Sequence, residues 1–140
     1  MRQILLFAAL AASLTLLSGC ALSKAKEDKA EDMTGKAAYH KISAEEAYEM
    51  MASQEVVVVD VRTREEYDGG HIENAVLVPS ESIGSEMPAA LPDKEATLLI
   101  YCRSGRRSKD AAQKLLALGY QSVYDFGGVI DWPYELVKEG

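Results

Sequence analysis

The sequence contains few cysteines, prolines and glycines, the residues on which disulfide-rich and collagen-like proteins depend. Its 140 residues include only two cysteines, which excludes a disulfide-rich scaffold and a cysteine-rich zinc module. Its 4 prolines and 10 glycines are too few for a collagen-like or low-complexity chain. Its longest apolar stretch, from Ile4 to Leu17, is shorter than the roughly 20 residues that a permanent transmembrane helix needs.

Positive charge is also scarce. The chain has 15 Lys and Arg against 22 Asp and Glu, a net charge of -7. A general attraction to phosphate is therefore not expected, and no nucleic acid partner is predicted. The composition, 48% hydrophobic and 26% charged residues, is that of an ordinary globular protein. The length of 140 residues allows at most one domain.

Residues 1–19 have the pattern of an export signal, with Arg2 ahead of the apolar stretch. The Leu-Ser-Gly-Cys ending at positions 17–20 resembles the lipobox of bacterial lipoproteins. This resemblance implies that the signal is removed and that Cys20 carries fatty acyl chains such as palmitate. The protein would then be anchored to the periplasmic or extracytoplasmic face of a bacterial membrane. The alternative is an ordinary secretory signal that is cut elsewhere.

Residues 20–38 are expected to form the lipidated cysteine and a charged tether. Residues 21–38 contain four lysines, four acidic residues and only two large apolar side chains, too few to build a core. A flexible chain and a short frayed helix both remain possible for this segment. Either form would hold the remaining domain, residues 39–140, away from a membrane surface.

Residues 39–140 alternate short apolar runs with amphipathic ones. The expected strands are 56–59, 75–78, 97–101 and 122–126. The expected helices are 43–52, 63–68, about 82–91, 106–118 and 129–138, the first two opened by capping boxes. The alternation predicts a three-layer α/β fold whose mainly parallel central sheet is flanked by helices. In such a fold, ligands bind beyond the carboxyl ends of the strands.

The segment Cys-Arg-Ser-Gly-Arg-Arg-Ser, residues 102–108, follows a predicted strand and opens a predicted helix. Backbone N–H groups in such a loop can form a cradle for an anion, and they favour a thiolate over a thiol. Residues 39–140 hold ten basic and eighteen acidic side chains, and four of the ten basic ones lie within seven residues of Cys102. This basic cluster comprises Arg103, Arg106, Arg107 and Lys109. The pattern favours Cys102 as a nucleophile over the alternative of a small buried hydrophobic residue.

Three separated stretches resemble the rhodanese family of sulfurtransferases. They are Asp60-Val61-Arg62 with Glu66-Tyr67 and Gly70-His71-Ile72, then Tyr101 to Ser108, and finally Gly127-Gly128 with Trp132. The resemblance covers about residues 39–138 and implies a single rhodanese-like domain in which Cys102 accepts a sulfane sulfur as a persulfide. It also implies an anion-binding loop formed by Arg103, Ser104, Gly105, Arg106, Arg107 and Ser108. One departure is that Glu73-Asn74 stand where the family often has Pro-Gly.

The length of the loop separates two kinds of chemistry. Related phosphatases and arsenate reductases place five residues between the cysteine and an arginine. Here four residues separate Cys102 from Arg107, and Ser108 stands at the next position. This shorter loop resembles the sulfurtransferase form. A phosphatase or arsenate reductase remains an alternative, as does a persulfide-binding or redox-sensing module with little turnover.

The reaction implied by the resemblance is a double displacement without a cofactor. The donor is a small anion such as thiosulfate, and the acceptor is an external thiol, cyanide or a protein. If Cys20 is acylated, Cys102 is the only free thiol, so no internal cysteine can discharge the persulfide. A monomer is expected, and a supply of reductant is part of this hypothesis.

The remaining polar residues of the motifs have structural interpretations. His71 is expected to be a hydrogen-bonded structural residue rather than a general base. His40 has no neighbours at metal-ligand spacing, so no metal site is predicted. Asp60 and Arg62 are expected to form an ion pair that fixes the adjacent helix. A turn is predicted at residues 127–128, and Trp132 is expected to contact the core.

Overall fold

The computed structural model describes residues 37–139, which lie within one compact unit of the chain. The predicted export signal, Cys20 and the tether up to residue 36 lie outside the described residues. The helices are α1 (Ala44–Ser53), α2 (Arg64–Asp68) and α3 (Arg106–Ala117), with 3-10 turns η1 (Ser80–Ser82) and η2 (Val129–Asp131). The strands are β1 (Ala38–Lys41), β2 (Val57–Asp60), β3 (Val76–Leu77), β4 (Thr97–Cys102) and β5 (Ser122–Gly128). No helix within residues 37–139 is long and apolar enough to cross a membrane.

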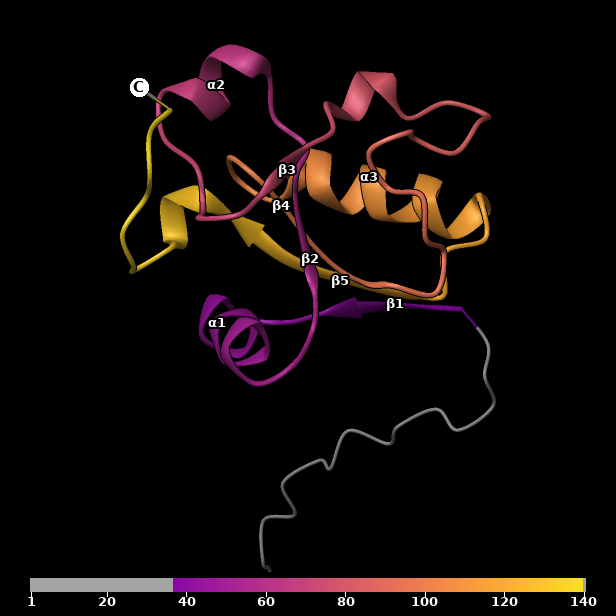
Figure 1. Cartoon of the computed structure of the whole chain (residues 1–140), viewed down its shortest axis with the longest axis horizontal. Coiled ribbons are helices and arrows are strands. Elements are labelled where there is room, and N and C mark those ends of the chain that lie inside the picture. The colour runs from indigo at the N-terminus through magenta and orange to yellow at the C-terminus, as the bar shows by residue number, and fades with distance from the viewer. Residues whose placement is uncertain (1–36, 140) are drawn as a thin grey trace, which may run out of the picture. The chain divides into compact units, whose positions relative to one another are not determined.

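All five strands run parallel in one sheet, in the order β1-β5-β4-β2-β3. Helix α3 lies on one face of the sheet and α1 on the other (Figure 1). The prediction of a three-layer α/β domain with a parallel sheet is therefore confirmed. Strand β1 at the sheet edge was not predicted, because its sequence Ala-Tyr-His-Lys contains no apolar run.

Strand β4 is buried on both faces of the sheet. Its successive side chains point in opposite directions, so that Leu98, Ile100 and Cys102 join the core beneath α3. Leu99 and Tyr101 join the core on the α1 side. This double burial explains the continuous apolar run in the sequence, and it fixes Cys102 at the end of a rigid element.

Both predicted capping boxes are confirmed. The Ser43 hydroxyl accepts a hydrogen bond from the Glu46 amide at the start of α1, and the Glu46 carboxylate accepts one from the Ser43 amide. Thr63 and Glu66 make the same exchange at the start of α2. The second box places the short helix α2 directly after β2, at the same end of the sheet as Cys102.

The helix predicted at residues 82–91 is wrong. The chain forms only the turn Ser80–Ser82 there and then runs irregularly to β4. Pro88 lacks the N–H group that a continuing helix needs. Only Ile83 and Leu91 are fully buried in this segment, so there is no apolar face for a helix to bury.

The helix predicted at residues 129–138 is also wrong beyond its first turn, η2. Pro133 disfavours helical backbone in the residue before it, and Trp132 is extended with ψ 112°. The segment that follows η2 pairs instead with the backbone at His71. His71 and Val137 exchange two backbone hydrogen bonds, of 2.9 and 2.8 Å, in an antiparallel bridge.

Candidate active site

Cys102 ends β4, the middle strand of the sheet, where the chain turns into α3. Residues 103–105 form the connection, and Gly105 adopts φ 97° immediately before the helix. This left-handed conformation favours glycine because a side chain there would be strained. The Gly105 amide donates a hydrogen bond to the Cys102 Sγ at 3.0 Å. The loop therefore folds back over the thiol, which is only 1% exposed.

Two opposing effects set the pKa of the Cys102 thiol. Burial raises the pKa because it disfavours the charged thiolate. Hydrogen bonds from the amides of Ser108, Gly105 and Ser104, and from the Ser108 hydroxyl, lower it. The net pKa lies below the ordinary value for cysteine, so the hydrogen bonds outweigh burial. A thiol in this environment has the character of a nucleophile.

The loop packs against two glycines at the end of β5. A Cβ atom on Gly128 would lie 2.3 Å from the Arg103 carbonyl oxygen and 2.6 Å from the Ser104 Cα. Gly127 adopts φ 92° and lies behind Gly105. The predicted turn at these residues is wrong, since both belong to β5. Their function in the fold is to permit close approach of the Cys102 loop.

Arg107 is engaged by a carboxylate. Its two terminal nitrogens donate to the Glu66 oxygens at 2.7 and 2.9 Å, a bidentate ion pair between α3 and α2. Hydrogen bonding from Arg107 lowers the pKa of Glu66 to about 2. From the sequence, Glu66 belongs to the rhodanese-like motif and to the predicted capping box that opens the helix at residues 63–68. Its second contact was missed because a residue-spacing pattern within α2 carries no information about α3.

The other predicted loop residues differ in their accessibility. Arg103 and Arg106 are exposed, and no ion pair involves either side chain among the described residues. Ser108 is fully buried, and its hydroxyl donates to Asp125 at 2.7 Å. The Ser108 side chain is therefore directed toward the protein interior rather than toward solvent. The exposed arginine charges of the loop are therefore those of Arg103 and Arg106.

The predicted ion pair between Asp60 and Arg62 is confirmed. The Arg62 guanidinium donates to Asp60 at 2.6 Å and to the Gly70 carbonyl at 2.8 Å, with both charged residues buried. The Tyr101 hydroxyl donates to the same carboxylate and accepts from the Ile72 amide. This network ties β2 and β4 to the chain that leaves α2.

His71 has the structural place expected of it. It is buried, its ring stacks on Tyr67 at 3.6 Å, and its Nδ1 lies 2.9 Å from the Tyr67 carbonyl oxygen. The hydrogen bonds of His71 join it to Tyr67 and Val137, and none of them involves the Cys102 thiol. Among residues 37–139, no cluster of His, Cys, Asp and Glu side chains is arranged to hold a metal ion.

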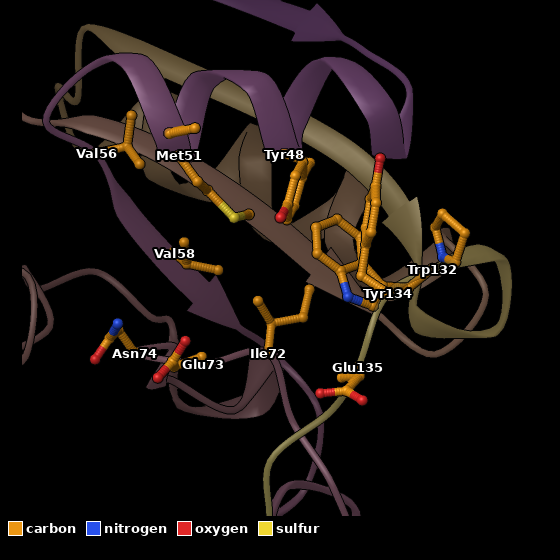
Figure 2. A pocket seen from close by; sticks show the side chains of 12 residues that line it. Tyr48, Met51, Val56, Val58, Ile72, Glu73, Asn74, Trp132, Tyr134 and Glu135 are labelled. Atoms are coloured by element: carbon orange, nitrogen blue, oxygen red, sulfur yellow. The ribbon is translucent and has the colours of Figure 1, made fainter.

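A pocket of about 880 Å³ lies on the α1 side of the sheet, and Figure 2 shows its aromatic wall. Tyr48, Trp132 and Tyr134 form this wall, and Trp132 is 9% exposed, which confirms the expected core contact. No residue of the Cys102 loop lines the pocket. The thiol chemistry therefore belongs to the loop and not to this pocket.

The sequence of the domain matches one family of known domains. The family described as Rhodanese-like domain matches residues 43–133 of the chain. The chain belongs to the rhodanese family. Two solved structures are similar to this rhodanese domain. One, described as rhodanese with anions from E. coli, is 33% identical with a TM-score of 0.55, covering 61% of this chain and 100% of that one. The other, a human single-domain sulfurtransferase, is 27% identical with a TM-score of 0.59, covering 66% and 93%.

Curated relatives of this rhodanese domain include longer proteins. The tRNA uridine(34) hydroxylase of Yersinia pestis is 32% identical over 106 residues. The match covers 72% of this chain and 30% of the hydroxylase, so the chain spans less than a third of that relative.

The departure at residues 73–74 leaves the rhodanese fold intact. These residues form a turn in which Asn74 adopts φ 63°. Asparagine tolerates this left-handed conformation better than other residues with side chains, and glycine adopts it freely. The change from the family's frequent Pro-Gly therefore keeps the turn.

We expect Gly128→Ala to destabilise the rhodanese domain by about 2 kcal/mol or more, because the added Cβ meets fixed backbone atoms of residues 103 and 104. Gly128 has φ -116°, so the effect is steric and not a consequence of unusual backbone conformation. Urea unfolding would measure the change. Gly84→Ala is the matched control, because a Cβ at Gly84 meets nothing within 4 Å. Equal midpoints for the two variants would contradict this prediction.

We expect Glu66→Gln to lower the free energy of unfolding at neutral pH by roughly 1 kcal/mol, a modest value because the ion pair is partly exposed and screened. The pKa of Glu66 is lowered from 4.5 to about 2 in the folded protein. Its contribution is therefore complete above 4.5 and disappears as the pH falls toward 2. Wild type and E66Q should unfold alike near pH 2. The exposed Glu55→Gln is the control, and a difference that is independent of pH would disprove the assignment.

Proposed function

We propose that this protein is a sulfurtransferase that carries a sulfane sulfur on Cys102. The observation that carries the proposal is the lowered pKa of a buried thiol whose surrounding donors are mainly backbone amides of the loop. Such donors stabilise a thiolate, and they suit an anionic sulfur equally well. The similarity to a human single-domain sulfurtransferase, most of whose length is matched, supports the same activity.

The proposed first step loads the enzyme. The Cys102 thiolate attacks the outer sulfur of thiosulfate, a new S–S bond forms, and the S–S bond of thiosulfate breaks as sulfite leaves with the bonding electron pair. In the second step, the thiolate of an external acceptor attacks the outer sulfur of the Cys102 persulfide. This attack regenerates the Cys102 thiolate and gives the acceptor persulfide. Cyanide can accept the sulfur in the same way and become thiocyanate.

The exposed and the buried residues of the loop have different roles in this reaction. The exposed Arg103 and Arg106 attract an anionic donor to the loop. The Gly105 and Ser108 amides hold the negative sulfur once it has entered. Arg107 orders the loop from its ion pair with Glu66 rather than contributing an unopposed charge. No general base is needed, because the attacking thiol is already favoured as a thiolate.

An external acceptor is part of the proposal. Cys102 is the only cysteine among the described residues, and Cys20 is assigned to the lipid anchor. No second thiol of the domain can therefore receive the sulfur. A low-molecular-weight thiol, cyanide or a protein cysteine must discharge the persulfide.

We also propose that Cys20 anchors the protein by lipid to the exported face of a bacterial membrane. The support is the Leu-Ser-Gly-Cys ending of the N-terminal apolar segment. Several acyl chains on one cysteine give stable attachment, whereas a single chain does not.

The sulfur-transfer proposal is tested by mass spectrometry of the intact protein after incubation with thiosulfate. We expect a gain of one sulfur atom that a thiol reverses, and no gain in Cys102→Ser. The same samples are assayed with an aryl phosphate and with arsenate. Uptake that is equal in C102S, or turnover of the phosphate without sulfur uptake, would reject the proposal. Uptake without discharge to any acceptor would identify a persulfide-binding module instead of an enzyme.

The anchor is tested by fractionating bacterial cells that express the full chain. Wild type is expected in the membrane fraction, with a mass that shows acylation of Cys20. Cys20→Ser should move to the soluble fraction while its sulfur uptake at Cys102 is unchanged. Membrane retention of C20S at the wild-type level would show that Cys20 is not the anchor.

A further inference from the structure

Asp125 is a buried carboxylate that the proposed reaction does not use. It lies in β5 and is only 1% exposed. Its Oδ1 accepts from the Ser108 hydroxyl at 2.7 Å and from the Gly127 amide at 2.9 Å. Its Oδ2 accepts from the Tyr39 hydroxyl at 2.8 Å and lies 3.5 Å from the Lys41 Nζ. One oxygen therefore faces the Cys102 loop, and the other faces the edge strand β1.

Ser108 connects this carboxylate to the thiol. Its hydroxyl has a single hydrogen but several acceptors within reach, namely Asp125 at 2.7 Å, the Gly105 carbonyl at 3.1 Å and the Gly127 carbonyl at 3.4 Å. The Cys102 sulfur lies beside the same group: Gly105, whose carbonyl oxygen is 3.1 Å from the Ser108 hydroxyl, donates its amide to Sγ at 3.0 Å, and the Ser108 hydroxyl lowers the pKa of the thiol. A hydroxyl donates one hydrogen at a time, so Asp125 and Cys102 compete for it.

A second route leads from Asp125 to the thiol through the backbone. Asp125 fixes the amide of Gly127, and Gly127 lies directly behind Gly105. Gly105 in turn donates its amide to the Cys102 Sγ at 3.0 Å. The carboxylate thus acts on two donors to the thiol: it competes for the Ser108 hydroxyl hydrogen, and it supports the Gly105 amide through a packing contact.

We propose that Asp125 is a positioning residue that controls where the Ser108 hydroxyl hydrogen points and so how strongly the loop stabilises the Cys102 thiolate. The inference rests on the proposed function, in which that thiolate takes up sulfur. In the resting thiol the hydrogen lies on Asp125, at the shortest of the acceptor distances given above. When Cys102 ionises, the thiolate draws the same hydrogen away from the carboxylate. Loading with sulfur moves the negative charge to the outer atom, and the hydrogen returns to Asp125.

The charged and titratable groups around Asp125 and Cys102 come from three elements. They are Tyr39 and Lys41 from β1, Arg107 from α3, and Glu66 from α2, which neutralises Arg107. Tyr39 and Lys41 stabilise the carboxylate from the side opposite the loop. The donors on Oδ2 therefore weaken the hold of Asp125 on the Ser108 hydrogen.

The test is the pH dependence of alkylation of Cys102 by iodoacetamide. It uses the full-length protein between about pH 5 and pH 10, a range that spans thiol titration. The modified Cys102 peptide is followed by mass spectrometry, so that Cys20 does not contribute. In Asp125→Asn the competing charge is gone and the Ser108 hydrogen is released to the thiolate. We expect the pKa of Cys102 to fall, with alkylation below that pKa faster by about threefold or more.

The direction in which the pKa of Cys102 shifts in D125N distinguishes a positioning role of Asp125 from simple support of the fold. A carboxylate that only braced the loop would leave fewer donors on the thiol when removed, and D125N would then alkylate more slowly at low pH. Ser108→Ala is expected to raise the pKa of Cys102, and D125N should have less effect in the S108A background. An unchanged or raised pKa in D125N, or an equal effect in both backgrounds, would overturn the proposal.

A conservative variant keeps the test valid if D125N does not fold. Tyr39→Phe removes a donor from Oδ2 without changing charge, so Asp125 should hold the Ser108 hydrogen more tightly. We expect slower alkylation of Cys102 at low pH by roughly twofold, opposite in sign to D125N. Tyr124→Phe is the matched control, because the Tyr124 ring stacks on His40 and its hydroxyl makes no hydrogen bond to the Asp125 carboxylate. A rate in Y39F equal to that in Y124F would overturn the proposal in that case.

Alkylation requires no sulfur donor, so these results are independent of sulfur transfer. A protein that shows the expected shifts but takes no sulfur from thiosulfate would disprove only the proposed function. A protein that takes up sulfur but shows none of the shifts would disprove only the role of Asp125.

Discussion

A thiol inside a protein ionises only where hydrogen-bond donors replace the water it has lost, and this requirement organises the structure around Cys102. Strand β4 ends at the cysteine and leaves it nearly inaccessible, which opposes the thiolate. The following loop compensates by turning its amides inward, for which Gly105 must adopt a left-handed conformation. The loop can lie this close to β5 only because Gly128 has no side chain. One chemical requirement therefore accounts for a strand end, a helix start and a pair of glycines that are distant in sequence.

Carboxylates form ion pairs with two of the arginines near the Cys102 loop. Asp60 holds Arg62 inside the protein, and Glu66 holds Arg107 at the start of α3. These ion pairs use arginine for its fixed bidentate geometry, which orders the segments that carry it. The exposed Arg103 and Arg106 lack such partners among residues 37–139 and keep their charge available. An acidic domain thus presents positive charge beside its thiol without a uniformly basic surface.

Much of this arrangement could be predicted from the sequence because it depends on local patterns. Apolar runs defined four of the strands, two capping boxes defined helix starts, and the loop motif located Cys102 between β4 and α3. The failures have physical causes. A strand such as β1, with no apolar run, forms through backbone pairing with β5, which no local pattern records. Glu66 and Asp125 act on residues 41 and 17 positions away, so their contacts depend on the finished fold.

The parallel sheet also gives the domain a direction. In every strand the amino end lies at one pole and the carboxyl end at the other, and Ala38 aligns with Ser122 at the pole where Thr97 begins β4. Cys102 lies at the opposite pole, at the far end of that six-residue strand, about 17 Å along it. The backbone therefore enters the described domain on the side away from its thiol (Figure 1). A molecule approaching Cys102 therefore meets the end of the described domain opposite to the one at which its backbone begins.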